Sequence, residues 1–104
     1  MQTLCVRFFA HEGMKHEHQP VHEWLFNVAR DLGIPGGTAF RACAGYGRHG
    51  FHSDTFFELA GGLPETVEFF AEAERIDALI ERVGAAGLHL VYVCHPVAMG
   101  KTGS

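Results

Sequence analysis

Histidine is the residue type whose abundance first points to chemistry in this chain. Eight histidines occur among 104 residues, and His11, His16, His18 and His22 fall within twelve positions. Because neutral imidazole binds transition metals, His16, His18 and His22 are candidate metal ligands. A closed zinc site, however, needs cysteine pairs or a Cys, His, Asp and Glu set of fixed spacing, and the chain has neither. A solvated polar loop is the favoured interpretation, and a transition-metal site is the alternative.

A glycine-rich segment is the second feature that could do chemistry. Gly45, Gly47 and Gly50 match the G-x-G-x-x-G spacing of dinucleotide sites, where the backbone approaches a pyrophosphate at the start of a helix. The residues that follow, Phe51–Leu59, show no helical pattern, and 104 residues are too few for a doubly wound sheet. A dinucleotide fold is therefore not expected. Exposed N–H groups at the end of a strand, together with Arg48, can still hold a phosphate.

The chain shows no set of residues typical of a catalytic site. Cys43 and Cys94 lie in apolar segments, where a thiol is usually inert, and no nucleophile elbow, His-Glu-x-x-His pair or phosphate-loop lysine occurs. We therefore expect a protein that is not an enzyme. Cys5, Cys43 and Cys94 are odd in number and far apart, so we expect reduced thiols and a cytoplasmic protein.

Charge and hydropathy exclude several further classes of protein. Eight Lys and Arg residues against 12 Asp and Glu give a formal net charge of −4, which argues against nucleic-acid binding because that requires a basic face. The early apolar run Leu4–Ala10 is interrupted by Arg7, and no run reaches the roughly 20 apolar residues of a membrane span. No signal peptide and no direct membrane insertion are expected. The length and the 47% hydrophobic content fit one domain, residues 1–104.

Periodicity in the sequence predicts six elements. Segments rich in β-branched and aromatic residues predict four strands, at Thr3–Phe9, Thr38–Ala44, Glu65–Phe70 and Leu88–Cys94. Apolar residues at helical spacing predict two helices, with buried faces Val21, Trp24, Leu25, Val28, Ala29, Leu32 and Ile76, Leu79, Ile80, Val83. Pro20 opens the first helix and Gly33 ends it. We expect a polar loop at 11–19, a mobile loop at about 45–55 and a flexible tail at about 98–104.

The order strand, helix, strand, strand, helix, strand predicts an α+β, ferredoxin-like βαββαβ fold. Two helices can cover only one face of its four-stranded antiparallel sheet. Yet the last strand carries Leu90 and Tyr92 on one face and Val91 and Val93 on the other. An uncovered apolar face of that size favours a partner subunit, so we expect an oligomer.

The residues around the second strand resemble the signature of a known family. They are Leu32-Gly33-Ile34-Pro35-Gly36-Gly37-Thr38, then Arg41, then Gly45-Tyr46-Gly47. This run is similar to the signature of the PII-like family called domain of unknown function 190, and the resemblance extends over about residues 3 to 100. Gly37 stands where that family usually has alanine, and Ala42 replaces the glycine that usually follows the arginine. Both changes exchange one small residue for another.

The resemblance implies a regulatory, signalling protein: a homotrimer with ligand clefts between subunits, in which a mobile loop reports occupancy to a membrane transporter or another regulated partner. PII-like relatives bind adenine nucleotides in these clefts. The positions carried over are Gly36, Gly37 and Thr38 near the base or ribose, and Arg41, Gly45, Tyr46, Gly47 and Arg48 around the phosphate. The short acidic segment Phe70–Glu74 favours AMP or ADP over a triphosphate, and no cofactor is required. The alternative is a metal-binding or metal-tolerance module with CutA-like architecture that uses His16, His18 and His22.

Overall fold

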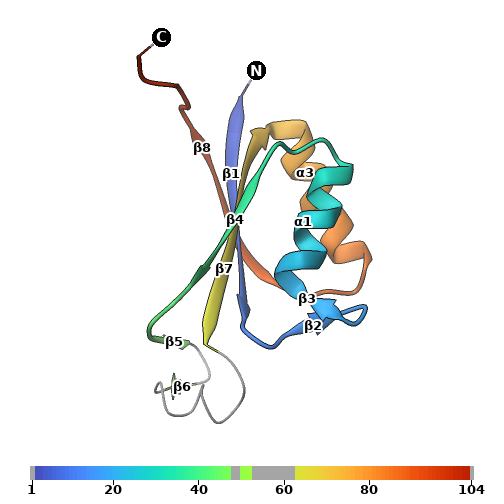
Figure 1. Cartoon of the computed structure of the whole chain (residues 1–104), viewed down its shortest axis with the longest axis vertical. Coiled ribbons are helices and arrows are strands. Elements are labelled where there is room, and N and C mark those ends of the chain that lie inside the picture. The colour runs from blue at the N-terminus through green and yellow to red at the C-terminus, as the bar shows by residue number, and fades with distance from the viewer. Residues whose placement is uncertain (1, 48–49, 53–62, 104) are drawn as a thin grey trace.

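The main sheet has four antiparallel strands in the order β4-β7-β1-β8. The computed structural model describes residues 2–47, 50–52 and 63–103. The four strands are β1 (Thr3–His11), β4 (Gly37–Arg41), β7 (Pro64–Glu72) and β8 (Val91–Val97). The helices α1 (Val21–Asp31) and α3 (Ala73–Ala85) both lie on one face of this sheet (Figure 1). The predicted ferredoxin-like βαββαβ fold is confirmed.

Helix α1 forms where the apolar spacing predicts it. Its buried residues are Val21, Trp24, Leu25, Val28 and Ala29. Pro20 occupies the N-cap position, one residue before the helix and not within its first turn. At the other end Gly33 takes a φ of +79°, a left-handed conformation that glycine adopts without steric cost.

Helix α3 completes the core, which lies between the two helices and one face of the sheet. Ile76, Leu79 and Val83 of α3 are buried, as their spacing predicts. The sheet residues that they join in the core cluster are Val6, Phe8, Val67, Phe69 and Ala71. Strand β7 ends at Glu72 and α3 begins at Ala73. The short acidic segment that we expected between the third strand and the second helix is therefore strand end and helix start, and it forms no loop.

Strand β8 differs from its predicted bounds of Leu88–Cys94. It begins later, at Val91, and continues through Pro96, which pairs with Leu4 of β1. Proline cannot donate a ladder hydrogen bond, but β8 is an edge strand with one unpaired side, where proline is tolerated. Leu88 and Leu90, which we assigned to the strand, instead pack against the core from the connection before it.

The polar segment expected to be a loop at 11–19 contains a small hairpin. Strands β2 (Lys15–His16) and β3 (Gln19–Pro20) pair antiparallel. Between them Glu17 and His18 both have positive φ, 52° and 67°, as in the two-residue turns that match the twist of paired strands. The indole N–H of Trp24 donates to the Glu17 carboxylate at 2.7 Å and fixes the turn on α1.

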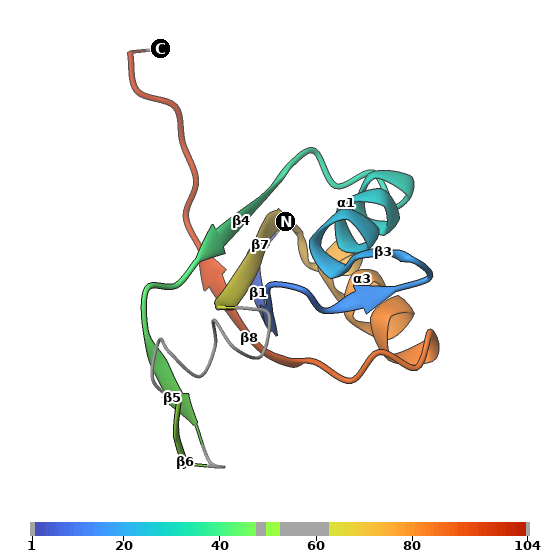
Figure 2. The same cartoon turned by 60° about the horizontal axis from the view of Figure 1, so that its bottom comes forward.

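A second hairpin lies beyond β4, within the segment expected to be a loop at about 45–55. Strands β5 (Gly45–Gly47) and β6 (Gly50–His52) pair antiparallel. Alternating glycines give no hydrophobic pattern, so the sequence could not show this pairing. Residues 48–49 and 53–55 lie outside the described residues, and the predicted mobility stays a prediction. The tail from residue 98 runs away from the sheet in extended form (Figure 2).

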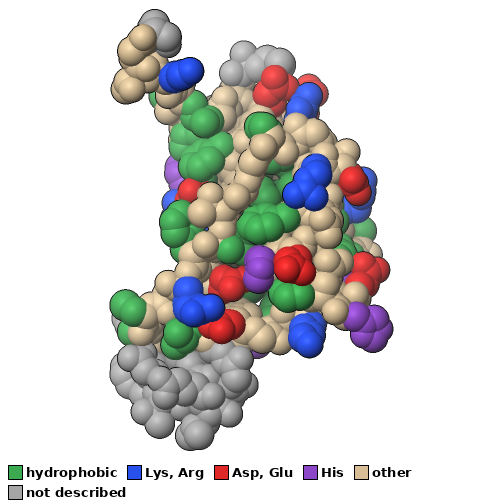
Figure 3. All heavy atoms as spheres, viewed as in Figure 1, with side chains coloured by type: hydrophobic (Ala, Val, Ile, Leu, Met, Phe, Trp, Pro, Cys, Tyr) green, Lys and Arg blue, Asp and Glu red, His purple; other side chains and the backbone are tan. Residues whose placement is uncertain are grey.

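The sheet face away from the helices combines exposed apolar side chains with an ion pair and is not covered by any described segment. Cross-strand pairing places Phe9 of β1 beside Val91 of β8 and Arg7 beside Val93, and these two valines and Phe9 are exposed. Figure 3 shows hydrophobic side chains along the strand side of the molecule and charged side chains over the helices. In the middle of this open face, Arg7 and Glu68 form an ion pair at 2.9 Å. No helix in the described ranges is long and apolar enough to cross a membrane.

Candidate functional site

The edge strand β4 contains three of the candidate ligand residues taken from the family signature, Gly37, Thr38 and Arg41. A cavity of about 270 Å³ lies at its first residue, between the end of α1 and the sheet. Phe26 and Phe69 provide aromatic walls, Ile34 and Pro35 an aliphatic rim, and Arg30 a charge. The predicted ligand residues Gly36 and Gly37 both line it. Thr38 points to the opposite face of the sheet, because neighbouring residues of a strand alternate.

Gly37 allows this part of the sheet to pack closely. A Cβ atom at position 37 would lie 2.4 Å from Cε1 of Phe69 and 3.2 Å from Cε1 of Phe26. The two phenylalanine rings meet edge to face, with centroids 6.0 Å apart. The aromatic wall of the cavity therefore depends on glycine at position 37, whereas a Cβ at Gly36 would meet no atom within 4 Å.

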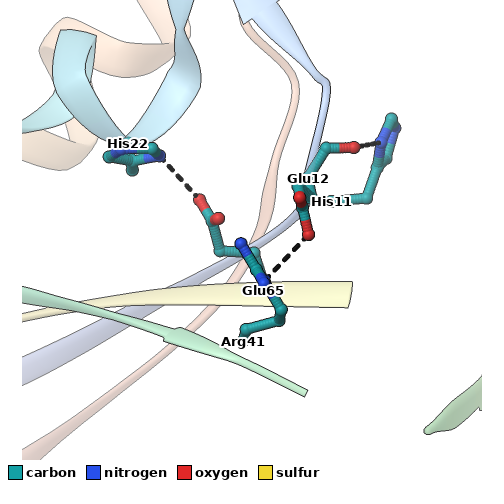
Figure 4. Close-up of polar contacts among 5 residues, drawn as sticks. All are labelled: His11, Glu12, His22, Arg41 and Glu65. Carbon is teal, nitrogen blue, oxygen red and sulfur yellow. Dashed lines mark hydrogen bonds and ion pairs between the residues drawn. The ribbon is translucent and has the colours of Figure 1, made fainter. Parts of the chain in front are cut away.

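Arg41 lies at the other end of β4, about 13 Å along a strand of this length. It lines a second cavity, of about 190 Å³, together with His11, Glu12, His22 and Glu65. The side chains of Glu12, His22, Arg41 and Glu65 converge from the connection after β1, from α1, from β4 and from β7, whereas the ring of His11 is turned away from Arg41 (Figure 4). We name the converging group the Arg41 cluster. Position 41 was expected to hold a phosphate, and the structure shows that its guanidinium already has a carboxylate partner.

That partner is Glu12, in the connection after β1. Its Oε2 lies 2.8 Å from Nε of Arg41, and both side chains are well exposed, 41% and 62%. The contact with Glu12 uses Nε, one of the three nitrogens of the guanidinium. An anion that replaced Glu12 would find paired donors on this guanidinium.

Glu65 is the buried charge of the Arg41 cluster. Only 8% of the residue is exposed, and its Oε1 lies 3.1 Å from Nδ1 of His22 at the start of α1. A buried carboxylate needs such a partner, because its unpaired charge would be costly. The sequence contains a signal for Glu65: it occupies the same alternating face of β7 as Val67, Phe69 and Ala71. We found no spacing that selects Glu12.

The three candidate metal ligands do not form one group. The ring of His16 packs edge-on against Trp24, with centroids 4.7 Å apart, His18 is in the β2–β3 turn, and His22 contacts Glu65. In the part of the chain that the structure describes, no three His, Cys, Asp or Glu residues are placed to hold a metal ion. The geometry gives the metal alternative no support.

The rest of the signature lies in the second hairpin. Gly45 begins β5, and the backbone of Tyr46 and Gly47 continues it. Arg48 lies outside the described residues. The structure thus places Gly36 and Gly37 at one end of β4 and Arg41 at the other, with Gly45 four residues further along the chain.

The three cysteines are free thiols. Burial raises the pKa of the Cys5 thiol, and the negative charge of Glu68 raises it further. Loss of hydration also raises the pKa of Cys94, with a smaller contribution from Asp77. Both shifts disfavour the nucleophilic thiolate. Cys43, expected inside a strand, is exposed and lies beyond the end of β4, so its assignment to an apolar strand was wrong.

A third cavity, of about 370 Å³, lies between α3 and β8. Its walls are mainly apolar and include Phe8, Ile80, Val83, Leu90 and Tyr92. The sequence predicted no site residue there.

Comparison with solved structures defines the class of protein. The chain superimposes on CPII from Thiomonas intermedia K12 bound to ADP and bicarbonate with a TM-score of 0.68, at 17% identity, covering 97% of this chain and 91% of that one. It also superimposes on CPII bound to ADP, AMP and acetate with a TM-score of 0.62, at 18% identity, covering 96% and 91%. CPII is described as a nitrogen regulatory PII-like protein. The fold of this chain is therefore PII-like.

The family follows from the sequence. The family model DUF190, described as "Uncharacterized ACR, COG1993", matches residues 3–99. The UPF0166 protein of Aquifex aeolicus (strain VF5) is 34% identical over 84 residues, which are 80% of each chain. The chain belongs to the domain of unknown function 190 family, as its resemblance to the signature predicted.

Proposed function

We propose that this protein is a PII-like regulator that binds an adenine nucleotide, AMP or ADP, along β4. The observation that carries the proposal is the layout of this edge strand. A cavity with aromatic walls lies at Gly37, and the guanidinium of Arg41 lies at the far end of the same strand. An aromatic base and an anionic phosphate require those two environments. The ADP and AMP bound to the CPII neighbours support the same ligand class.

The nucleotide cleft would be completed by a neighbouring subunit of a homotrimer. Strand β4 is at the edge of the sheet, so one side of the site faces away from its own chain. The exposed apolar residues of the open face, including Phe9, Val91 and Val93, supply the surface that such a subunit would cover.

In this proposal the protein acts as a sensor and not as an enzyme. Occupancy at Arg41 would be reported to a regulated partner protein, such as a membrane transporter, through the segment that leaves β4. Three free cysteines fit a reducing, cytoplasmic environment.

Calorimetry with AMP and ADP tests the ligand. Replacing Arg41 with alanine should weaken nucleotide binding by about 1–3 kcal/mol, the range for a hydrogen bond to a charged group. Arg82→Ala is the matched control, since it removes the same charge from an exposed position of α3 and should leave binding unchanged. Absence of heat with both nucleotides, or equal losses in the two variants, would contradict the proposed site.

A further inference from the structure

The guanidinium of Arg41 is occupied by a side chain of its own protein. Figure 4 shows Glu12 and Arg41 pointing toward each other, with Oε2 of Glu12 at 2.8 Å from Nε. A carboxylate and a phosphate use the same charge-assisted hydrogen bonds to a guanidinium. Glu12 therefore takes one of the positions that an anionic ligand would use.

Backbone contacts hold the two residues close together. The N–H of Glu12 donates to the carbonyl of Leu63 at 2.7 Å, and the N–H of Ala42 donates to the carbonyl of Pro64 at 2.7 Å. The end of β1 and the end of β4 are thus fixed to two consecutive residues at the start of β7. This backbone arrangement brings the two side chains within reach of each other.

The pair is nevertheless easy to exchange. Its side chains are 41% and 62% exposed, and ion pairs so well hydrated contribute little free energy. The neighbouring pair differs, because Glu65 is buried and its contact with His22 is partly buried, the His22 side chain being 33% exposed. An anion that enters the cavity would displace Glu12 from Arg41 and leave Glu65 on His22.

We propose that Glu12 is an internal competitor for the anion site at Arg41, an inference that rests on the proposed function. When a site is occupied by its own side chain for part of the time, the apparent dissociation constant rises by the inverse of the unoccupied fraction. For an exposed ion pair this factor is about two- to sixfold. Ligand binding also releases Glu12, so the connection after β1 changes its contacts when the site is filled.

Calorimetry of ADP with Glu12→Gln tests this competition. Glutamine keeps the backbone N–H and the shape of the side chain but removes the charge, so the dissociation constant should fall by about two- to sixfold. Glu81→Gln is the matched control, since it removes the same charge from an exposed position of α3 and should change nothing. If Glu12→Gln binds ADP no more tightly than the wild type does, or if both variants gain equally, the inference is wrong while the nucleotide sensor stands.

A measurement without nucleotide distinguishes the failure of the Glu12 competitor from the failure of the nucleotide sensor. Inorganic phosphate is titrated while the Nε–Hε resonance of Arg41 is followed by ¹⁵N NMR. In Glu12→Gln, half of the change in this resonance should occur at about two- to sixfold less phosphate than in the wild type. This result, with no heat from ADP, would overturn the nucleotide sensor and keep the competitor. If phosphate leaves the resonance unmoved in both proteins, the competitor is overturned.

Discussion

Gly37 shows how one missing side chain shapes the candidate site. The ring of Phe69 fills the space that a Cβ atom at position 37 would need, at 2.4 Å from Cε1. Gly36, the preceding residue, meets no atom within 4 Å of an added Cβ. This chain has glycine at position 37, where the family signature has alanine. The ring of Phe69 fills the space that the methyl group of an alanine would need.

Replacing Gly37 with alanine should destabilise the protein. Because the added methyl group overlaps a ring buried in the core, the free energy of unfolding should fall by about 1–3 kcal/mol, measured by urea denaturation. Gly36→Ala is the matched control and should stay within about 0.5 kcal/mol of the wild type. The double variant Gly37→Ala/Phe69→Leu should recover part of the loss. Equal effects of the two single alanine variants would refute the close contact.

At the scale of elements, the β2–β3 hairpin is built around two residues in the left-handed region. Glu17 and His18 have φ values of 52° and 67°, a conformation that costs an L-residue about 1–2 kcal/mol. Glu17 has a compensating hydrogen bond from Trp24 at 2.7 Å. The hairpin holds the polar segment against α1, and through α1 it positions His22 beside Glu65.

His18→Gly should stabilise the hairpin, since glycine adopts positive φ without a steric penalty. We expect a gain of about 0.5–1 kcal/mol in the free energy of unfolding, measured by thermal denaturation followed by circular dichroism. His89→Gly is the control, because His89 is exposed and is not among the residues with positive φ. It should be neutral or destabilising. A loss of stability in His18→Gly would show that the turn residue contributes more than its backbone conformation.

At the scale of the whole molecule, the open sheet face has a mixed character. It combines exposed apolar residues, such as Phe9 and Val93, with the Arg7–Glu68 ion pair near its middle, where Glu68 is only 15% exposed. A subunit that covers this face would bury the pair further without leaving either charge unpartnered, which would keep the cost of burial low. The proposed homotrimer is consistent with both features.

A charge on the open face should break the proposed trimer. Light scattering should report three subunits for the wild type and a smaller species for Phe9→Asp, because association would bury an unpaired carboxylate. Ala85→Asp adds the same charge at an exposed position of α3 and should remain trimeric. A wild-type protein that stays monomeric at micromolar concentration would contradict this assembly.

The sequence by itself determined the two helices, the four strands of the main sheet and the fold class, but not the two small hairpins. Helical spacing in α1 and α3 and the apolar character of the strands are local patterns, and each was read within one segment. The strand bounds differ from the prediction: β4 ends at Arg41 and β8 passes through Pro96. Strand ends depend on which neighbours pair, and a sequence pattern does not contain that information.

Only the tertiary structure decided the partners of the charged residues. Glu65 contacts His22, 43 positions away in the sequence, because the start of α1 packs against the start of β7. Glu12 meets Arg41 because their segments are bonded to consecutive residues: Glu12 to Leu63, just before β7, and Ala42 to Pro64, at its start. The family signature predicted that Arg41 binds a phosphate, but it could not show that Arg41 pairs with Glu12. Long-range pairing sets such contacts, so the chemistry of this site is a property of the folded sheet and not of residue spacing.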